Sequence, residues 1–272
     1  TISSREISQL AVILKTLVDE VYALGAKPFL FPAMGSHGGA TAEGQRAVAA
    51  GYGITEETMG CPLHSSMEVA LIGHTPGKGL PVHMDKYAAA ADHIIPVGRI
   101  KPHTDFRGPV ESGLMKMLTI GCGKQQGAFL CHQRGWGEMA ENVYEIARFI
   151  LEHQPVPFGL GIIEDSMHQV AKIQAVAAAH IAIQEPELLK LAKSYIPKIP
   201  FAKVDVLFVD ELGKDVSGAG TDPNVTGRSA QMGQSEPFHE PLAIPSLTPT
   251  TQHHAAGVGH ATALTELLYR AL

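Results

Sequence analysis

A short apolar strand that runs into a glycine-rich loop and then a helix is the feature that most constrains the fold. Residues 28–32 (PFLFP) read as the strand, 34–41 (MGSHGGAT) as the loop and 42–50 as the helix. This order is typical of α/β proteins, in which the loop lies at the carboxyl end of a parallel strand and ligands bind there. The loop matches neither GxGxxG nor a Walker A sequence, although a glycine-rich turn before a helix can hold phosphate through backbone N–H groups. Its candidate site residues are Gly35, Ser36, Gly38 and Gly39 for a cofactor, and His37.

Helical and strand-like patterns alternate along the rest of the chain. Helical spacing of apolar residues predicts helices over residues 4–24, 138–153 and 186–196. Short apolar runs predict strands at 69–72, 81–84, 93–97, 158–163, 172–178 and 204–209. Pro155 and Pro157 end the helix before them and mark a domain boundary. We therefore expect two α/β domains, 1–154 and 155–272, with mainly parallel sheets and the site in a cleft between them.

The segment 99–132 combines many glycines with reactive side chains, which favours function over connection. His103 follows a proline just past the strand expected at 93–97, and His132 ends the segment. Lys116 lies in a short, apolar, helical run whose first turn Ser112 is placed to cap. Such a lysine either extends its amine to water or is desolvated, and desolvation would lower its pKa and make it nucleophilic. The segment by itself favours the first interpretation.

Composition excludes several classes of protein. The formal net charge is −6 and no cluster of Lys or Arg offsets it locally, which argues against a nucleic-acid-binding protein. The 45% hydrophobic content is that of a globular chain, and no apolar run reaches the length of a membrane span. The chain has three cysteines, an odd number without a CxxC pair, which fits a reducing compartment. We expect a cytoplasmic protein of undefined oligomeric state.

Three segments together resemble the nickel-dependent lactate racemases, a family of 2-hydroxyacid racemases and epimerases. They are the glycine loop with His37, the Pro102-His103 pair, and Lys116 followed sixteen residues later by His132. The resemblance covers about residues 25–135. It implies that His37 and His103 are the two catalytic acid/base residues. It also implies that Lys116 carries a covalently attached nickel-pincer nucleotide, and that His132 is the protein ligand of the nickel.

The chemistry of such a reaction suits these residue types. Racemising a small 2-hydroxy acid breaks a weakly acidic C–H bond, and transfer of hydride to an electron-poor cofactor ring avoids an unstable carbanion. Each substrate face then needs a group that exchanges the hydroxyl proton near neutral pH, and histidine serves that purpose. Arg107, in the loop of His103, is a candidate clamp for the substrate carboxylate.

The chain also departs from the family pattern. The sequence ESGLMKM around Lys116 is poorer in glycine than the family's lysine segment, which indicates a divergent subgroup. In the second domain, residues 211–214 (ELGK) retain a candidate substrate-binding Lys214 but have Glu where the family has Gln. The resemblance further implies that members extend past both ends of this chain, so we expect the second domain to be incomplete at its C-terminus.

Two other functions remain open from the residues themselves. A zinc-type hydrolase could use His37, His103 and His132, although their spacings are not those of a zinc motif. A non-catalytic nucleotide-binding protein could use the glycine loop for phosphate and Lys116 as its ion-pair partner. A covalent adduct on Lys116 would favour the racemase, and bound zinc without an adduct the hydrolase.

Overall fold

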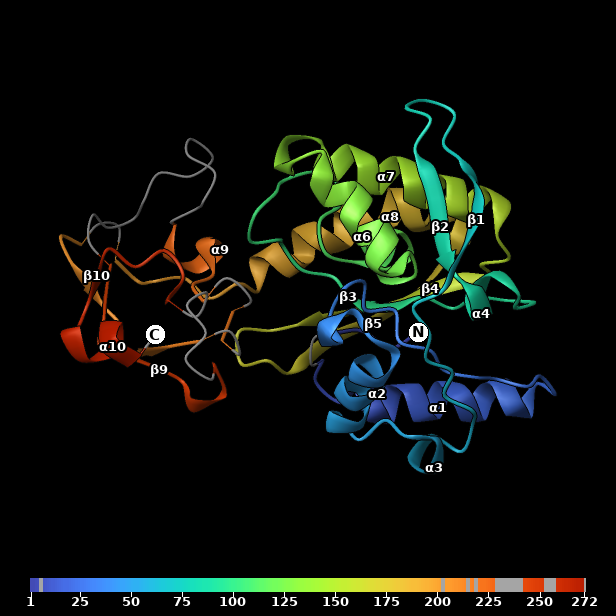
Figure 1. Ribbon diagram of the computed structural model, residues 1–272, viewed down its shortest axis with the longest axis horizontal. Coiled ribbons are helices and arrows are strands. Elements are labelled where there is room, and N and C mark those ends of the chain that lie inside the picture. The colour runs from blue at the N-terminus through green and yellow to red at the C-terminus, as the bar shows by residue number, and fades with distance from the viewer. Residues whose placement is uncertain are drawn as a thin grey trace. The chain divides into compact units, whose positions relative to one another are not determined.

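The computed structural model describes residues 1–4, 7–201, 204–213, 216–217, 220–227, 242–251 and 258–271. They form two compact units (Figure 1). The first unit comprises Thr1–Lys101 and Arg107–Tyr195, and the second comprises Pro102–Phe106 and Ile196–Leu272. The division lies at residue 195 and not at 154, because the strands on either side of Pro155 and Pro157 pair in one sheet. Those prolines end a helix without separating two cores.

The first unit contains most of the helices and strands. Its helices are α1 (Leu10–Ala23), η1 (Gly38–Ala40), α2 (Ala42–Gly51), α3 (Glu56–Met59), α4 (Lys86–Ala89), α5 (Leu114–Lys116), the π-helical turn η2 (Met117–Gly121), α6 (Lys124–Gln133), α7 (Trp136–His153) and α8 (Ala178–Ser194). Its strands are β1 (Val69–His74), β2 (Pro81–Asp85), β3 (Val97–Arg99), β4 (Phe158–Glu164) and β5 (Val170–Ala177).

A three-stranded sheet, β3-β4-β5, lies between two groups of helices in this unit (Figure 1). Figure 1 shows α1, α2 and α3 on one side and α6, α7 and α8 on the other. Val97 and Ile162 of the sheet pack into the buried cluster that includes Leu10 and Leu14 of α1. On the opposite side, Gly159 leaves room for Ile181 of α8. The α/β class is thereby confirmed for this unit.

The expectation of mainly parallel sheets is wrong for the first unit. β3 pairs with β4 in parallel, but β4 pairs with β5 antiparallel, and so do β1 and β2 with each other. β4 and β5 are joined by a tight turn at Asp165, which cannot connect parallel strands. The expected strand at 28–32 is reduced to single parallel bridges at Leu30 and Pro32, because prolines at both ends lack an N–H group for pairing.

The second unit is smaller and its described strand pairs are parallel. Its elements are β6 (Leu207–Phe208), β7 (Glu211–Leu212), α9 (Pro223–Thr226), β8 (Leu242–Ile244), β9 (Ser246–Leu247), η3 (Pro249–Thr251), β10 (Ala263–Leu264) and α10 (Glu266–Ala271). One sheet has the order β10-β8-β6, and β7 pairs with β9. Leu212, Ile244 and Leu268 form its buried cluster.

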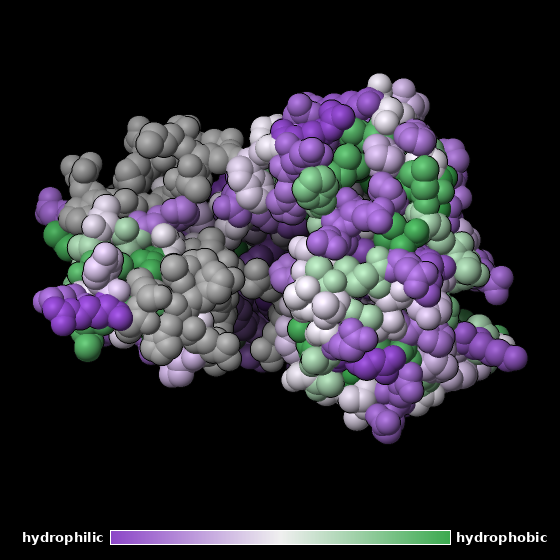
Figure 2. Space-filling model, in the orientation of Figure 1, coloured by the Kyte–Doolittle hydropathy of each residue, from purple (hydrophilic) through white to green (hydrophobic). Residues whose placement is uncertain are grey.

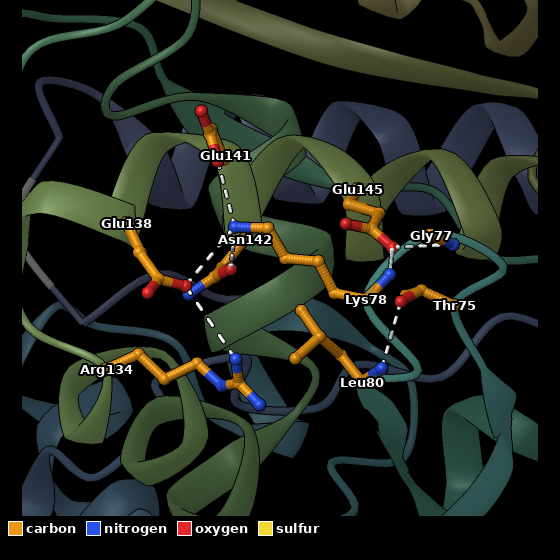
Figure 3. A network of polar contacts seen from close by, with 9 residues as sticks. All are labelled: Thr75, Gly77, Lys78, Leu80, Arg134, Glu138, Glu141, Asn142 and Glu145. Atoms are coloured by element: carbon orange, nitrogen blue, oxygen red, sulfur yellow. Dashed lines mark hydrogen bonds and ion pairs between the residues drawn. The ribbon is translucent and has the colours of Figure 1, made fainter.

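A network of polar contacts holds the turn between β1 and β2 on helix α7 (Figure 3). The Lys78 ammonium lies 2.9 Å from the Glu141 carboxylate and 3.3 Å from that of Glu138. Glu145 accepts hydrogen bonds from the backbone N–H groups of Gly77 and Lys78, at 3.1 and 2.7 Å. This network fixes one edge of the first unit through side chains that water reaches.

The described surface of the first unit mixes hydrophilic and hydrophobic residues on the face shown in Figure 2. Phe129 of α6 and Leu71 of β1 are large apolar side chains that are exposed to solvent. Within the described part of the chain, no helix combines the length and apolar character that a transmembrane span needs. Cys61, Cys122 and Cys131 are free thiols, and all three are buried.

Candidate functional site

The glycine loop, residues 34–41, lies directly against the helical segment that carries Lys116 and His132, which we call the lysine segment (residues 114–133). The backbone N–H of Gly35 donates to the carbonyl of Gly121 at 3.3 Å. A Cβ atom on Gly35 would meet Ile120 at 3.2 Å and Ala128 at 3.6 Å, and Gly35 has a φ of +57°. Both observations require glycine there, since a side chain would push the loop off the lysine segment.

Gly38 and Gly39 give the loop its left-handed turns. Both have a positive φ, at +64° and +65°. A Cβ atom on Gly38 would lie 2.6 Å from the backbone nitrogen of Gln45, whereas one on Gly39 would meet nothing within 4 Å. Gly38 is therefore packed against α2, while Gly39, like Ser36, is exposed. Thr41 then caps α2 by accepting a hydrogen bond from the Gly44 N–H at 3.0 Å.

His37 is exposed at the tip of this loop. Its Nδ1 lies 2.9 Å from the carbonyl oxygen of Met34, so Nδ1 is the protonated nitrogen of the neutral ring. The lone pair is then on Nε2. A histidine in this state can accept a proton at Nε2, as a general base must.

Lys116 is the last residue of the short helix α5 and is half-buried. The π-helical turn η2 follows it at once, and such turns are frequent at functional sites. The amine acts on the thiol of Cys131 in α6: burial raises the pKa of Cys131 to about 12, and Lys116 opposes that rise. The charge of Lys116 is thus felt at Cys131, the residue before His132.

The expected cap on the helix of Lys116 is wrong. Gly113, not Ser112, occupies the N-cap position, and a glycine has no side chain that could cap the helix. Glu185 of α8 does so instead, since its Oε2 accepts the N–H of Met115 at 3.0 Å. Burial raises the pKa of Glu185 to about 7, against the hydrogen bonds from the backbone of Met115 and Leu114. A Cβ atom on Gly113 would lie 2.1 Å from Glu185 Oε1, so the glycine makes room for this distant carboxylate.

His132 lies in the last turn of α6 and is exposed. Its Nδ1 lies 2.6 Å from the Ala128 carbonyl, one helical turn back, and its ring meets that of Trp136 edge-on at 5.4 Å. Since Nδ1 donates to the backbone, the lone pair is on Nε2. Histidines that bind metals commonly show this pattern, in which the second ring nitrogen is held by a backbone carbonyl.

His103 belongs to the second unit. Strand β3 ends at Arg99, so His103 does follow a strand end, as expected. Its Nδ1 accepts the N–H of Asp105 at 3.0 Å, and its ring packs on Phe106 with 4.4 Å between centroids. Asn224 of α9 donates to its carbonyl at 3.1 Å. With Nδ1 as acceptor, the neutral ring holds its proton on Nε2, the reverse of His37.

Of the two candidate substrate residues, the structure describes Arg107. Arg107 belongs to the first unit, where its guanidinium lies 3.8 Å from the buried carboxylate of Glu111. Glu111 also accepts a hydrogen bond from Lys193 at 2.7 Å. Lys214 lies outside the described residues. The clamp roles of both residues stay predictions, as do the roles of His37, His103, Lys116 and His132.

A buried polar network beneath the glycine loop was missed from the sequence. Lys124, the first residue of α6, is fully buried. Its ammonium donates to the Pro32 carbonyl at 2.5 Å and to Gln45 Oε1 at 2.8 Å, and it lies 3.3 Å from Asp85 Oδ2. The available signal was a lysine at the start of a helix, where the helix dipole disfavours a positive charge.

No group of three His, Cys, Asp or Glu side chains that could hold a metal ion occurs among the described residues. Within the first unit, contacts join the glycine loop, the lysine segment and the Lys124 network. The described residues therefore offer no zinc centre built by three protein side chains. A single histidine beside a tethered cofactor would need no such cluster.

Comparisons with a family model and with solved structures found similar proteins. None of the curated proteins compared matches the chain. The lactate racemase apoprotein from Thermoanaerobacterium thermosaccharolyticum is similar in structure, with 17% identity, a TM-score of 0.56, and 87% of this chain covered. The chain spans 57% of the length of that protein. A crystal structure of a protein from Thermotoga maritima has 11% identity and a TM-score of 0.59, with 97% of this chain and 85% of that one covered.

At such identities the solved structures show a shared fold alone. The sequence of residues 3–134 matches the family model described as the lactate racemase N-terminal domain. Those residues include the glycine loop, His103, the Lys124 network and the whole lysine segment. By this match, residues 3–134 belong to the lactate racemase N-terminal domain family.

Proposed function

We propose that the protein is a racemase or epimerase of a small 2-hydroxy acid that works with a lysine-tethered nickel-pincer nucleotide. The observation that carries the proposal is that residues 3–134 match the lactate racemase N-terminal domain and contain His37, His103, Lys116 and His132 in order. The contacts of Gly35 with the lysine segment support it, because the loop that contains His37 lies against the segment that would bind the cofactor.

The residues of the lysine segment fit the cofactor. The segment contains two lysines, and Lys116 is half-buried while Lys124 is fully buried and held by three groups. Of these two lysines, Lys116 is the less buried and is therefore the candidate for covalent attachment. His132 is exposed and directs the lone pair of Nε2 away from its own helix carbonyl. We therefore assign Lys116 as the tether and His132 as the nickel ligand. When bound, the cofactor would take hydride from C2 of the substrate and return it.

His37 and His103 would exchange the proton of the substrate hydroxyl. Their ring states are complementary, since His37 has its lone pair on Nε2 and neutral His103 has its proton there. The Asp105 carboxylate lies 3.7 Å from His103 Nδ1 and would face the ring when it gains a positive charge. One turnover removes a proton with one histidine and supplies a proton with the other, and the reverse reaction exchanges these roles. Arg107 and Lys214 would hold the carboxylate.

Co-expression with a cofactor-synthesis pathway tests the proposal. Intact mass, peptide mapping and nickel analysis of the purified protein should show an adduct on Lys116 and bound nickel. Lys116→Ala should lose the adduct, and His132→Ala should keep the adduct and lose nickel. Loaded protein should interconvert the enantiomers of lactate or of a larger 2-hydroxy acid. Bound zinc without an adduct would favour a hydrolase, and a loaded but inactive protein would contradict the racemase.

The two-base mechanism has its own test on the loaded protein. His37→Ala and His103→Ala should each slow racemisation from either enantiomer, by about 10²–10⁴-fold, because each turnover uses both groups. His93→Ala, which alters an exposed histidine outside the candidate site, is the control. Racemisation at the parent rate by either site variant would show that one histidine suffices.

A further inference from the structure

The Lys124 network ties the backbone of His37 to helix α6. Lys124 lies in the lysine segment, and its ammonium donates to Oε1 of Gln45 at 2.8 Å. The amide nitrogen of Gln45 then donates to the carbonyl of His37 at 3.2 Å and to that of Gly35 at 2.9 Å. Two side chains thus connect the start of α6 with the residue that we assign as a base.

The charge of Lys124 fixes which way the Gln45 amide points. In the present orientation the amide oxygen faces an ammonium and the amide nitrogen faces two carbonyls. A flipped amide would place its NH₂ group against the ammonium and its oxygen against the carbonyls, which is unfavourable at every contact. A neutral, apolar residue at position 124 would remove this preference, and the carbonyls of Gly35 and His37 would lose a fixed donor.

Stability by itself does not explain a buried lysine. Burial lowers the pKa of Lys124, against the Asp85 carboxylate, and burial raises the pKa of Asp85. Both charges are thus held in place at an energetic cost, and buried ion pairs are often replaceable by apolar residues without loss of stability. A specific geometry is the more direct gain. Lys124 holds the geometry of the glycine loop, since it also donates to the carbonyl of Pro32, which shortly precedes that loop.

We propose that Lys124 is a positioning residue, which acts through the side-chain amide of Gln45 to hold the glycine loop and the His37 imidazole in place against α6. The inference rests on the proposed function in that it assigns His37 a proton to transfer. The position of the imidazole, however, can be measured in protein that carries neither cofactor nor substrate.

Two variants break the connection at different points. Lys124→Met removes the ammonium and keeps a long side chain. Gln45→Glu keeps the shape and the contact with Lys124, but replaces the donor to the two carbonyls by an oxygen. Lys78→Met, which removes a surface lysine, is the control for the first variant. Gln125→Glu, on the exposed part of the first turn of α6, is the control for the second.

Hydrogen–deuterium exchange of peptides covering residues 33–41 and ¹⁵N NMR of the His37 ring report the effect in unloaded protein. The parent and both controls should show slow exchange in the loop and a proton on Nδ1 of His37. Both test variants should exchange at least about tenfold faster in the loop and lose that single tautomer, while far-UV circular dichroism stays native. On loaded enzyme kcat should fall by about 10²-fold with little change in KM.

Unchanged loop exchange and an unchanged His37 tautomer in a folded test variant would overturn the proposal. Where Lys124→Met does not fold, Gln45→Glu decides, because it leaves the buried lysine paired. If loaded parent protein does not racemise any 2-hydroxy acid, the proposed function fails while the exchange and NMR results still judge the role of Lys124. If the variants lose activity with an unaltered loop, Lys124 acts in another way and the proposal is wrong.

Discussion

Two lysines of the first unit make similar numbers of polar contacts in very different surroundings. Lys78 contacts Glu138, Glu141 and the amide oxygen of Asn142 on helix α7, and 28% of its side chain is exposed (Figure 3). Lys124 contacts Pro32, Gln45 and Asp85, and none of its side chain is exposed. Both join elements that lie far apart in the sequence.

The difference between them is the cost of removing water. The hydrogen bond to Glu141 raises the pKa of Lys78, and the desolvation that opposes this rise is smaller. Burial lowers the pKa of Lys124, even though Asp85 opposes the shift. A solvated network holds a turn on a surface and tolerates rearrangement. A desolvated network has only one arrangement that satisfies its groups, so it specifies a backbone geometry.

The largest expected effect follows from breaking the buried network. Lys124→Met should lower the free energy of unfolding by about 3–5 kcal/mol, because it leaves the Asp85 carboxylate buried without its countercharge. Urea titration followed by circular dichroism measures this. Adding Asp85→Asn should recover part of the loss. A double variant no more stable than Lys124→Met would show that the uncompensated charge is not the cause.

The second effect concerns a buried group of the opposite sign. Because the pKa of Glu185 is raised from its ordinary 4.5 to about 7, the folded protein binds this proton more tightly than the unfolded chain. The resulting stabilisation is full below pH 4.5 and is lost as the pH rises through 7. It amounts to about 3 kcal/mol. Unfolding free energies at pH 5 and pH 8 should differ less in Glu185→Gln than in the parent. Equal pH dependence would refute the assignment.

A third effect compares a packed and an open position of the glycine loop. Gly39→Ala should cost about 1–2 kcal/mol, the penalty of a left-handed backbone alone. Gly38→Ala should cost more, because its Cβ would also lie 2.6 Å from the backbone nitrogen of Gln45. Thermal melts of the two variants, run side by side, measure the difference. Equal losses would mean that the loop shifts freely away from α2.

The smallest effect is expected in the solvated network. Lys78→Met should change the free energy of unfolding by less than about 1 kcal/mol, and the difference should shrink further in high salt. The same urea titration as for Lys124→Met, at low and high salt, provides the comparison. A loss similar to that of the buried lysine would contradict the view that desolvation separates the two networks.

Periodic apolar patterns predict a helix correctly where the helix buries a single face. Apolar spacing predicts a helix over residues 138–153, and α7 covers them with Met139, Val143, Ile146, Ala147 and Ile150 buried. The sequence predicts a helix that begins at Pro186, whereas α8 begins at Ala178 and continues through the proline. Ile181, Leu188 and Leu189 pack on the core from both sides of it. Tertiary packing thus overcame a local breaker.

That shifted boundary hid a residue of the candidate site. Glu185 lies on the apolar stripe of α8, four residues after Ile181 and three before Leu188, so an acidic residue on a buried face was the available signal. A helix that begins at Pro186 leaves the Glu185 carboxylate in the preceding loop. The site predicted from the sequence therefore omits Glu185 because the predicted start of α8 is misplaced.

The sequence by itself determined the α/β class, the apolar face of α7 and the order His37, His103, Lys116 and His132, because each depends on residues close together along the chain. Only the tertiary structure decided that Glu185 caps the helix of Lys116, and that Lys124 reaches Pro32 and Gln45 across 92 and 79 residues. A polar side chain reads as solvated until its neighbours are known, since burial is a property of the whole fold.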